Sequence, residues 1–405
     1  MKSIVDRLRR REKVGFSEIL EAFGSALPLL HELKNTPQDK EWHAEGDVEI
    51  HTRSVLAECY SLLEADEGVS EHDWLVMVLG AAFHDIGKAL ATKTRLIGGR
   101  ERIVAPRHED KGRSYLSLRL LDTPLSEEER RGVLEIVGHH GEPKHLVVRD
   151  ETERRYRQLA RLANLKRLQA FCIADIKGRV AKDRRAQLEV LELFKLQCEE
   201  FGVWNSDPYE RWLEPLYTEE KLPDEMTREF VKNQAIWDFE KGYINSAYEA
   251  LARTRDRWRE RAKLTVLCGP SGSGKSTLIK RRFSEWELVS MDELREEITG
   301  KRSNQSKNGQ VAQAAFEELK KCLRGKQRVV WDSTNVTKAQ RKKVIDIGCA
   351  YGAEVELLVV EKAIGELKRA NARRSEPVPG SVIEKQIRNL EYPYENEAHR
   401  VVYVS

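Results

Sequence analysis

The chain has 405 residues and a mass of 46.7 kDa. At about 100–200 residues per domain, two or three domains are expected. Hydrophobic residues make up 40% of the chain and charged residues 34%, which excludes a disordered or fibrous protein. Basic and acidic residues almost balance, 70 against 67, but from residue 261 onward basic residues outnumber acidic ones by 27 to 19. This excess fits either a polyanionic partner or an ordinary solvated surface.

Membrane and secretory classes are not expected. The sequence has no uninterrupted apolar run near the roughly 18 residues that a membrane-spanning helix needs. It begins MKSIVDRLRRREK, which lacks the apolar core of a signal peptide. The six cysteines are far apart and form no C-x-x-C pair. A disulfide framework or zinc ribbon is therefore not expected, and the chain is predicted to be cytoplasmic.

The first 200 residues have helical periodicity throughout. Apolar residues recur at helical spacing in residues 55–63, 74–90, 126–138 and 156–180. Ser126 followed by Glu129 has the pattern of a capping box. We see no alternating strand pattern there, so residues 1–204 are predicted to form an all-α domain.

The helical spacing of apolar residues that marks the first 200 residues gives way to two other patterns farther along the chain. Residues 205–255 are rich in aromatic residues and proline, with a charged helix expected over 227–259, and are predicted to be a packed helical connector. Four strand-like segments then alternate with helical ones: LTVLCG, ELVSMD, RVVWDSTN and EVELLVVE. This alternation predicts a multidomain protein that ends in an α/β domain, residues 256–405, built on a parallel sheet.

The first of these strands leads into a phosphate-binding loop. The sequence GPSGSGKS fits G-x-x-x-x-G-K-S, placed between a strand and a helix. Such a loop turns backbone N–H groups around phosphate oxygens, with its lysine on the β/γ-phosphates and its serine on Mg²⁺. The cofactors predicted are therefore ATP or another NTP, together with Mg²⁺. The predicted nucleotide-binding residues are Gly269, Ser271, Gly272, Ser273, Gly274, Lys275, Ser276 and Thr277, with Arg369 and Arg373 from the lid described next.

Three later motifs indicate which type of phosphoryl transfer the P-loop domain carries out. In S-x-D-x-x-R, Asp292 could accept a proton from an acceptor hydroxyl and Arg295 could hold an acceptor phosphate, whereas an ordinary helix N-cap at Asp292 is the alternative. Arg369 and Arg373 share one helical face and could form a lid over the donor phosphates, or be a solvated basic helix. The DSTN segment, residues 332–335, either helps to hold Mg²⁺ and position the acceptor or is a plain turn.

In this order, GPSGSGKS, SMDELR, DSTN and RANARR resemble the P-loop polynucleotide 5′-kinases of the phage type. The resemblance covers about 140 residues. It implies that Lys275 and Ser276 serve NTP and Mg²⁺ and that Asp292 is the general base for a 5′-OH. It further implies that Arg295 contacts the neighbouring phosphate of the acceptor. Arg373, together with Arg369, would bind the donor phosphates.

A second group of polar residues lies in the helical part. Seven of the ten histidines fall between His51 and His145, and His84-Asp85 interrupts an otherwise apolar helix. Buried imidazole–carboxylate doublets are costly unless they are paired or bound to metal. Imidazole with carboxylate suits transition metals such as Mn²⁺, Co²⁺ or Ni²⁺. The predicted ligands are His51, His84, Asp85, His108, His139, His140 and Asp175.

This order strongly resembles the HD-domain phosphohydrolases, whose H…HD…D core would be His51, His84, Asp85 and Asp175. Dinuclear members add later histidines, here His108 and one or both of His139 and His140. The resemblance implies that Asp85 bridges two ions and that Lys88 faces the substrate phosphate. Five histidines outside this set are expected to have packing or surface roles: His31, His43, His72, His145 and His399.

Over nearly its whole length the chain resembles the bacterial HD-Pnk family, in which an HD phosphohydrolase domain precedes a polynucleotide kinase. The resemblance implies a bifunctional RNA end-healing enzyme. Its substrates would be RNA or DNA ends carrying a 5′-OH and a 2′,3′-cyclic phosphate, with a separate RNA ligase as a further partner. The competing hypotheses are a nucleotide phosphohydrolase fused to a small-metabolite kinase and a non-catalytic, NTP-gated nucleic-acid-binding protein.

Overall fold

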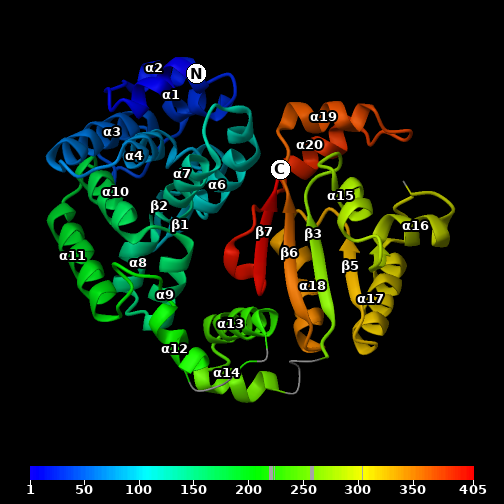
Figure 1. Cartoon of the computed structure of the whole chain (residues 1–405). Coiled ribbons are helices and arrows are strands. Elements are labelled where there is room, and N and C mark those ends of the chain that lie inside the picture. Colours follow the sequence, from blue (N-terminus) through cyan, green and yellow to red (C-terminus); the bar gives the residue numbers. More distant parts are fainter. Residues whose placement is uncertain (219–221, 223, 256–259, 303) are drawn as a thin grey trace. The chain divides into compact units, whose positions relative to one another are not determined.

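The computed structural model divides the chain into two compact units, Met1–Pro208 and Tyr209–Ser405 (Figure 1). It describes all residues except 219–221, 223, 256–259 and 303. The domain limits predicted at residues 204 and 255 remain predictions, and the boundary residue 256 and the expected helix end at 259 lie outside the described residues.

The first unit is mostly helical, as predicted. Its helices are α1 Lys2–Arg9, α2 Phe16–Phe23, η1 Pro28–Asn35, α3 Val48–Ala65, α4 Glu71–Phe83, α5 Lys88–Ala91, α6 His108–Arg119, η2 Leu120–Asp122, α7 Glu127–His139, α8 Glu142–Val148, α9 Glu153–Leu162, α10 Leu165–Lys177 and α11 Arg184–Glu200. The segment expected as one helix over 156–180 is broken at Ala163, and Asn164 caps the second piece.

Helix α4 forms the centre of this unit. It is apolar on all sides, and every residue from Trp74 to Phe83 is buried against neighbouring helices that include α3 and α7. By length and composition Glu71–Ala91 could cross a membrane, yet 89% of that window is buried inside the unit. The helix stops at Phe83, so His84 is its C-cap residue and Asp85 lies in the turn before α5.

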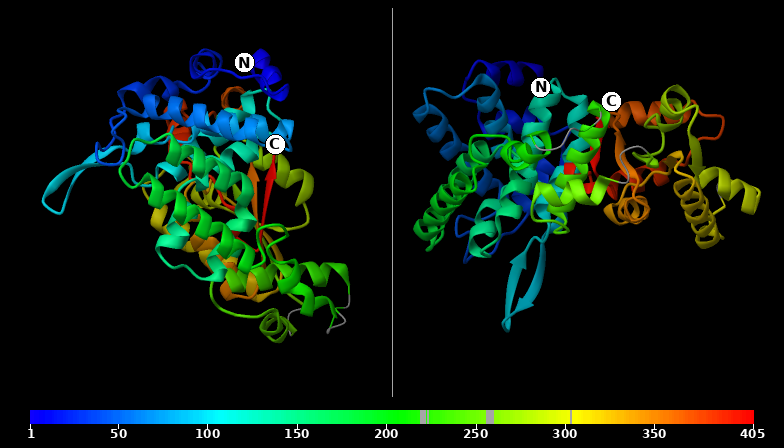
Figure 2. Two further views of the ribbon diagram at one scale, coloured as in Figure 1. Left: turned by 90° about the vertical axis from the view of Figure 1, so that its left-hand side faces the viewer. Right: turned by 60° about the horizontal axis from the view of Figure 1, so that its bottom comes forward.

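The prediction of an all-helical first domain is wrong for residues 93–104. Strands β1 Lys93–Ile97 and β2 Arg100–Val104 form an antiparallel hairpin, which Figure 2 shows projecting from the helical unit. Gly98 and Gly99 both have positive φ, 56° and 77°, as a tight two-residue hairpin turn requires. Strand β1 is exposed throughout, and β2 is exposed at its first two residues and half-buried at its last three. They therefore lack the apolar–polar alternation by which a half-buried strand is detected.

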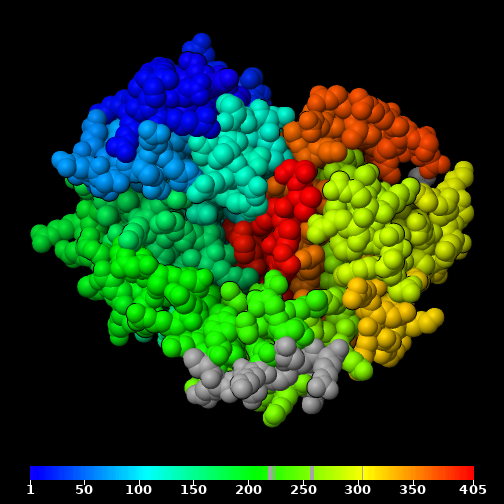
Figure 3. Space-filling model, viewed as in Figure 1, coloured from blue at the N-terminus to red at the C-terminus, as the bar shows by residue number. Residues whose placement is uncertain are grey.

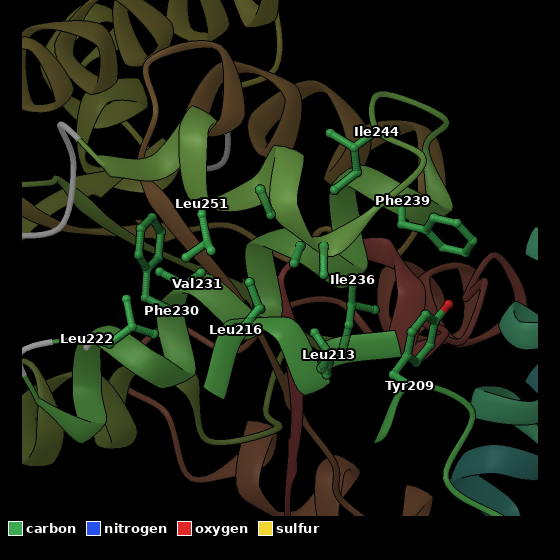
Figure 4. Packing of buried hydrophobic residues seen from close by; sticks show 13 residues of the cluster. Tyr209, Leu213, Leu216, Leu222, Phe230, Val231, Ile236, Phe239, Ile244 and Leu251 are labelled. Carbon is green, nitrogen blue, oxygen red and sulfur yellow. The ribbon is translucent and has the colours of Figure 1, made fainter. Parts of the chain in front are cut away.

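The second unit begins with a helical subdomain, α12 Glu210–Thr218, α13 Glu225–Glu240 and α14 Ala247–Thr254. The single helix expected from residue 227 onward is broken between α13 and α14, where Gly242 has positive φ and Ser246 caps α14. Figure 4 shows that these helices share a hydrophobic core of their own. Its members include Tyr209, Leu213, Leu216, Phe230, Val231, Ile236, Phe239, Ile244 and Leu251.

The rest of the second unit is the predicted α/β domain. Its elements are β3 Lys263–Cys268, α15 Lys275–Arg282, β4 Glu287–Ser290, α16 Met291–Thr299, α17 Asn308–Arg324, β5 Arg328–Asp332, α18 Lys338–Ala350, β6 Glu354–Val360, α19 Ile364–Ala372, α20 Gly380–Arg388, η4 Glu395–Glu397 and β7 Arg400–Val404. The strands form a parallel sheet in the order β4-β5-β3-β6-β7. The four predicted strands are therefore confirmed, and β7 extends the sheet.

Helices cover both faces of this sheet. Gly348 of α18 packs on Leu264 and lies near Val355, whereas α15 packs on Leu267 and Leu358. Because successive side chains of a strand point to opposite faces, these two helices lie on opposite sides of the sheet. The phosphate-binding loop and the DSTN segment begin at the carboxyl ends of the strands, the edge at which open α/β sheets bind their ligands.

Candidate functional site

The structure brings the HD doublet together with residues from four other helices of the first unit. His51 comes from α3, His108 from the start of α6, His140 from the end of α7 and Asp175 from α10. Nε2 of His51 lies 3.0 Å from Oδ1 of Asp175 and 3.7 Å from Oδ2 of Asp85. Nε2 of His84 lies 3.1 Å from the same Asp85 oxygen and 3.9 Å from Oδ1 of Asp175.

The second oxygen of Asp85 faces another pair of histidines. Oδ1 lies 3.2 Å from Nε2 of His108 and 3.8 Å from Nε2 of His140, and these two nitrogens are 3.2 Å apart. Ligands about 2.1 Å from a common ion lie roughly 3–4 Å from one another. The two groups therefore have the spacing of two adjacent metal sites that share the Asp85 carboxylate.

Backbone carbonyls fix the orientation of three of these imidazoles. In each case Nδ1–H donates to the carbonyl oxygen three residues earlier: His84 to Ala81 at 2.9 Å, His108 to Ala105 at 2.9 Å, and His140 to Val137 at 3.1 Å. This arrangement leaves each Nε2 unprotonated in the neutral ring and directed at the cluster. Orientation of metal-binding histidines by the other ring nitrogen is the usual arrangement around a metal.

The donor set fits a metal pair by its chemistry and by its burial. Among the residues that the structure describes, His84 Nε2 and Asp85 Oδ2 are buried atoms without a hydrogen bond, although Nζ of Lys88 lies 2.7 Å from that oxygen. Burial disfavours ionisation of Asp85, but His84 and Lys88 outweigh it and hold the Asp85 pKa well below its usual range. Burial lowers the pKa of His140 to about 4, so its ring is neutral and able to bind metal near pH 7.

His139 is not placed with the other predicted ligands. It is the last residue of α7, and the groups of ligand atoms found in the described part of the chain contain His140 instead. Burial, with the nearby Arg113, lowers the pKa of His139 to about 3. Neighbouring residues of a helix point in directions about 100° apart, so the two histidines cannot face the same centre equally well.

Sequence reasoning missed three side chains around this cluster. Glu45 Oε1 lies 2.8 Å from Nδ1 of His43, with which it forms a hydrogen bond, and 3.0 Å from Nδ1 of His51, where the angles of a hydrogen bond are not met. His43, expected to be a surface or packing residue, thus belongs to the site. Arg179 pairs with Asp175 one helical turn earlier, and that i, i+4 spacing was a usable signal.

In the second unit, the P-loop has the predicted strand–loop–helix context. Lys275 Nζ donates to the carbonyl oxygens of Gly269 and Pro270 at 2.7 and 3.1 Å. Gly272 has a φ of +89°, and a β-carbon there would lie 2.7 Å from the carbonyl oxygen of Leu367 in α19. The loop therefore packs closely under the helix that carries the predicted lid. In Figure 3, α19 and α20 (orange) lie at the surface of this unit beside α15 (yellow-green).

The alternative interpretation of the S-x-D-x-x-R motif, in which Asp292 is only the N-cap of a helix, does not fit the structure. Ser290, at the end of β4, accepts the N–H of Glu293 and is the N-cap of α16. Asp292 is therefore left free of capping, and its side chain is 65% exposed and paired with Arg295. The guanidinium of Arg295 also lies 3.4 Å from Oδ1 of Asn308. Asp292 and Arg295 thus form a paired unit at the carboxyl end of the sheet.

The DSTN segment has two roles. Asp332 is near enough to the P-loop lysine for their charges to interact: burial raises the Asp332 pKa, and the charge of Lys275 opposes that rise. Asn335 has a left-handed φ of 45° and donates to the carbonyl oxygen of Leu267 at 2.7 Å, and the carbonyl oxygen of Thr334 accepts the N–H of Gly269 at 2.9 Å. The end of the segment therefore braces the loop, and Asp332 at its start is a buried carboxyl group within electrostatic reach of the loop lysine.

The two arginines predicted to form a lid lie on α19 and at its end. Arg369 lies on α19, and Arg373 follows it as the C-cap; both are exposed. Burial lowers the pKa of Lys275, and the charge of Arg374 lowers it further. The charge of Arg374 also lowers the pKa of Asp332, against the rise caused by burial. Arg374, which directly follows the predicted Arg373, is therefore a further cation whose charge acts on the loop lysine.

Parts of the chain are similar to known proteins. A family model described as an AAA domain matches residues 264–393. Two solved structures of Pnkp1/Rnl/Hen1 assemblies are similar over part of the chain. The RNA repair complex matches at 22% identity and a TM-score of 0.31, covering 34% of this chain and 47% of that one. A second structure of the complex matches at 21% identity and a TM-score of 0.27, covering 30% and 43%.

The chain thus spans less than half the length of the solved chains that it matches. The second unit is a P-loop, kinase-like nucleotide-binding domain. The first is a helical unit whose histidine–aspartate cluster forms a candidate metal centre.

Proposed function

We propose that this protein is a bifunctional RNA end-healing enzyme. Its second unit would phosphorylate a polynucleotide 5′-OH with ATP or another NTP. Its first unit would open a 2′,3′-cyclic phosphate and remove the remaining 2′- or 3′-phosphate. One observation carries the proposal: a single chain contains both kinds of site. The first is the histidine–aspartate cluster in which Asp85 belongs to two groups of ligands, and the second is a P-loop followed by the Asp292–Arg295 pair. One break in RNA produces both kinds of end.

In the first unit, divalent transition-metal ions bound by the cluster would supply Lewis acidity and activate water for attack on phosphorus. The chain's own residues prepare the substrate. Lys88 lies 2.7 Å from Asp85 and Arg179 pairs with Asp175, so two cations stand beside the ligand carboxylates. These cations can hold the non-bridging oxygens of a phosphate ester and offset the charge that grows on them. Gln38 accepts from Nζ of Lys88 at 2.8 Å and keeps this lysine in place.

In the second unit, Lys275 and the loop N–H groups would bind the β/γ-phosphates, and Ser276 with Asp332 would hold Mg²⁺ directly or through water. Asp292 would take the proton of the 5′-OH. Arg295 would exchange its contact with Asp292 for the phosphate next to that hydroxyl, which frees the carboxylate to act as a base. Arg374, Arg373 and Arg369 would close over the donor. The dominant contribution is positioning and charge stabilisation rather than covalent chemistry.

The test uses one RNA that carries a 5′-OH and a 2′,3′-cyclic phosphate, given to the full chain with ATP, Mg²⁺ and Mn²⁺. The expected product carries a 5′-phosphate and has lost its 3′-terminal phosphate. A matched set of nucleosides, small alcohols and free nucleotides is assayed in parallel. Faster reaction with these small molecules than with RNA would instead favour a nucleotide phosphohydrolase fused to a metabolite kinase. Sealing of the product by an added RNA ligase would extend the proposal to a repair reaction completed by a ligase partner.

A further inference from the structure

A cavity of about 370 Å³ opens beside the histidine–aspartate cluster. Its size is within the roughly 300–1,000 Å³ that small-molecule sites occupy. Three of the candidate metal ligands, His108, His140 and Asp175, form part of its wall. A molecule bound in this cavity can therefore reach the cluster while extending away from it.

Cations line the part of the cavity next to the ligands. Lys88, Lys144 and Arg179 belong to its wall, and Arg95 adds a further cation from the hairpin. Burial lowers the pKa of Lys144, and the nearby charge of Arg179 lowers it further. Cations that crowd one another in this way gain from an anion bound between them. The inner part of the cavity thus fits a phosphate ester.

The rest of the wall is mixed: it contains the polar residues Gln38, Asp39, His43, Thr92, Glu109 and His145, and an apolar part that comes largely from the hairpin and from the segment before α3. Ile97, Ile103 and Val104 contribute aliphatic surface, and Trp42 contributes an aromatic ring that is 47% exposed. No metal or phosphate chemistry needs this surface. Trp42 shares this wall with the aliphatic side chains of the hairpin, so its exposed ring belongs to an apolar patch rather than standing alone, and such patches mark binding sites.

Trp42 is held in place rather than loosely attached. The guanidinium carbon of Arg102 lies 4.3 Å from the centroid of the Trp42 ring. Arg102 is itself fixed by Asp39, at 2.9 Å, and by Glu41. Asp39 also accepts the backbone N–H of Ile103 at 3.3 Å, which ties the hairpin to the segment that carries Trp42. The ring is therefore pre-oriented at the cavity wall before any ligand binds.

We propose that this cavity binds the terminal nucleotide of the substrate, with its phosphate among Lys88, Lys144 and Arg179 and its base stacked on Trp42 against the hairpin. The inference rests on the proposed function of the first unit and names the part of the substrate that this unit recognises. The combination of an anion site and an aromatic–aliphatic wall within one nucleotide-sized cavity distinguishes a nucleotide from a sugar phosphate or inorganic polyphosphate. Stacking is tolerant of sequence, since every base has a π-face.

Trp42→Ala in the full chain tests the proposal. The substrates are an RNA that ends in adenosine 3′-phosphate, the same RNA ending in an abasic ribose 3′-phosphate, and free adenosine 3′-monophosphate. The KM for the base-bearing RNA should rise about tenfold to a hundredfold, the range of a lost base–aromatic stack, with little change in kcat. The KM for the abasic RNA should stay unchanged. Trp42→Phe should restore most of the affinity, because it keeps an aromatic face.

Leu96→Ala is the matched control, because Leu96 is 74% exposed on the same hairpin but does not line the cavity. It should alter neither KM. An equal rise for base-bearing and abasic RNA, or no rise in either, would overturn the proposal. Comparing the KM of the RNA with that of free adenosine 3′-monophosphate shows whether the nucleotide comes from a polynucleotide end or from solution.

Equilibrium binding separates this inference from the proposed function. Adenosine 3′-monophosphate is dialysed against chelator-treated protein in a Lys275→Ala background, which weakens nucleotide binding at the P-loop. Trp42→Ala should raise the Kd by the same factor as the KM, even if the wild-type chain releases no phosphate from RNA. Phosphate release without any effect of Trp42 on Kd would leave the proposed function standing and refute the nucleotide cavity.

Discussion

Gly87 and His108 approach each other so closely that no side chain fits between them. A β-carbon on Gly87 would lie 2.0 Å from the carbonyl oxygen of His108 and 2.6 Å from the backbone nitrogen of Gly112. This contact presses the turn that carries Asp85 against the start of α6. It thereby sets the 3.2 Å separation between Asp85 and His108, on which the second metal position depends.

We therefore expect Gly87→Ala to lower the free energy of unfolding of the first unit by about 1–3 kcal/mol, because backbone atoms must move to admit the methyl group. Phosphatase activity should fall more than the remaining folded fraction explains, since Asp85 and His108 move apart. Urea denaturation and phosphate release measure the two effects. Gly309→Ala is the control, because a β-carbon there meets nothing within 4 Å. Equal stability of both variants would contradict the close-contact argument.

The shared carboxylate of Asp85 predicts unequal losses of metal. His108→Ala should leave His51, His84, Asp85 and Asp175 around the first position and reduce bound ions from two per chain to about one. Asp85→Ala should release both, because each oxygen of Asp85 faces a different group. Metal analysis of protein purified with Mn²⁺ gives the counts. One ion in both wild type and His108→Ala, with activity unchanged, would show a mononuclear centre.

Asp292→Ala should lower kcat for phosphorylation of a 5′-OH oligonucleotide roughly 10²–10⁴-fold, the usual loss when a general base is removed. Its side chain is exposed at the carboxyl end of the sheet, so the fold should not change. Phosphate release by the first unit is the internal control. Glu293→Ala, one residue on, should keep most of the kinase activity. A near-normal kcat in Asp292→Ala would remove this carboxylate from the mechanism.

Arg295→Ala should raise the KM for the acceptor more than the KM for NTP. The guanidinium is held beside Asp292 and Asn308, on the acceptor side of the loop. Steady-state kinetics with each substrate varied in turn separates the two constants, and Arg295→Lys shows whether a charge alone is enough. A rise confined to the KM for NTP would assign Arg295 to the donor.

The electrostatic link between Arg374 and Lys275 predicts that Arg374→Ala affects the donor reaction more than Arg373→Ala does. We expect a drop in kcat of about tenfold or more for Arg374→Ala, since lid arginines stabilise charge on the transferred group. Single-turnover phosphoryl transfer at saturating ATP reports this step. Lys368→Ala is the matched control, because this cation of α19 is 52% exposed and pairs with Glu384. A larger loss of kcat in Arg373→Ala than in Arg374→Ala would instead support the lid of Arg369 and Arg373 that the i, i+4 pattern predicts.

Local pattern was enough to predict the main architecture. The strand–loop–helix context of Lys275 and the alternation of strands with helices are encoded within short stretches, as are the apolar helix before His84 and the cap at Ser126. Such features depend on hydrogen bonds and side-chain periodicity between residues a few positions apart. The sequence alone therefore determined that a helical unit precedes a parallel α/β domain.

What only the tertiary structure decided depends on contacts between distant segments. That His140 rather than His139 meets Asp85 and His108 depends on helices far apart in the sequence, and the place of Glu45 follows from its nearness to His51. The exposed hairpin left no burial pattern to detect, yet it supplies part of the wall of the nucleotide cavity. Spacing along a chain fixes which way neighbouring side chains point. Which side chains from distant segments meet depends on how whole helices pack together. That packing is driven by the removal of apolar surface from water across the entire unit, and it leaves the interior nearly as dense as an organic crystal.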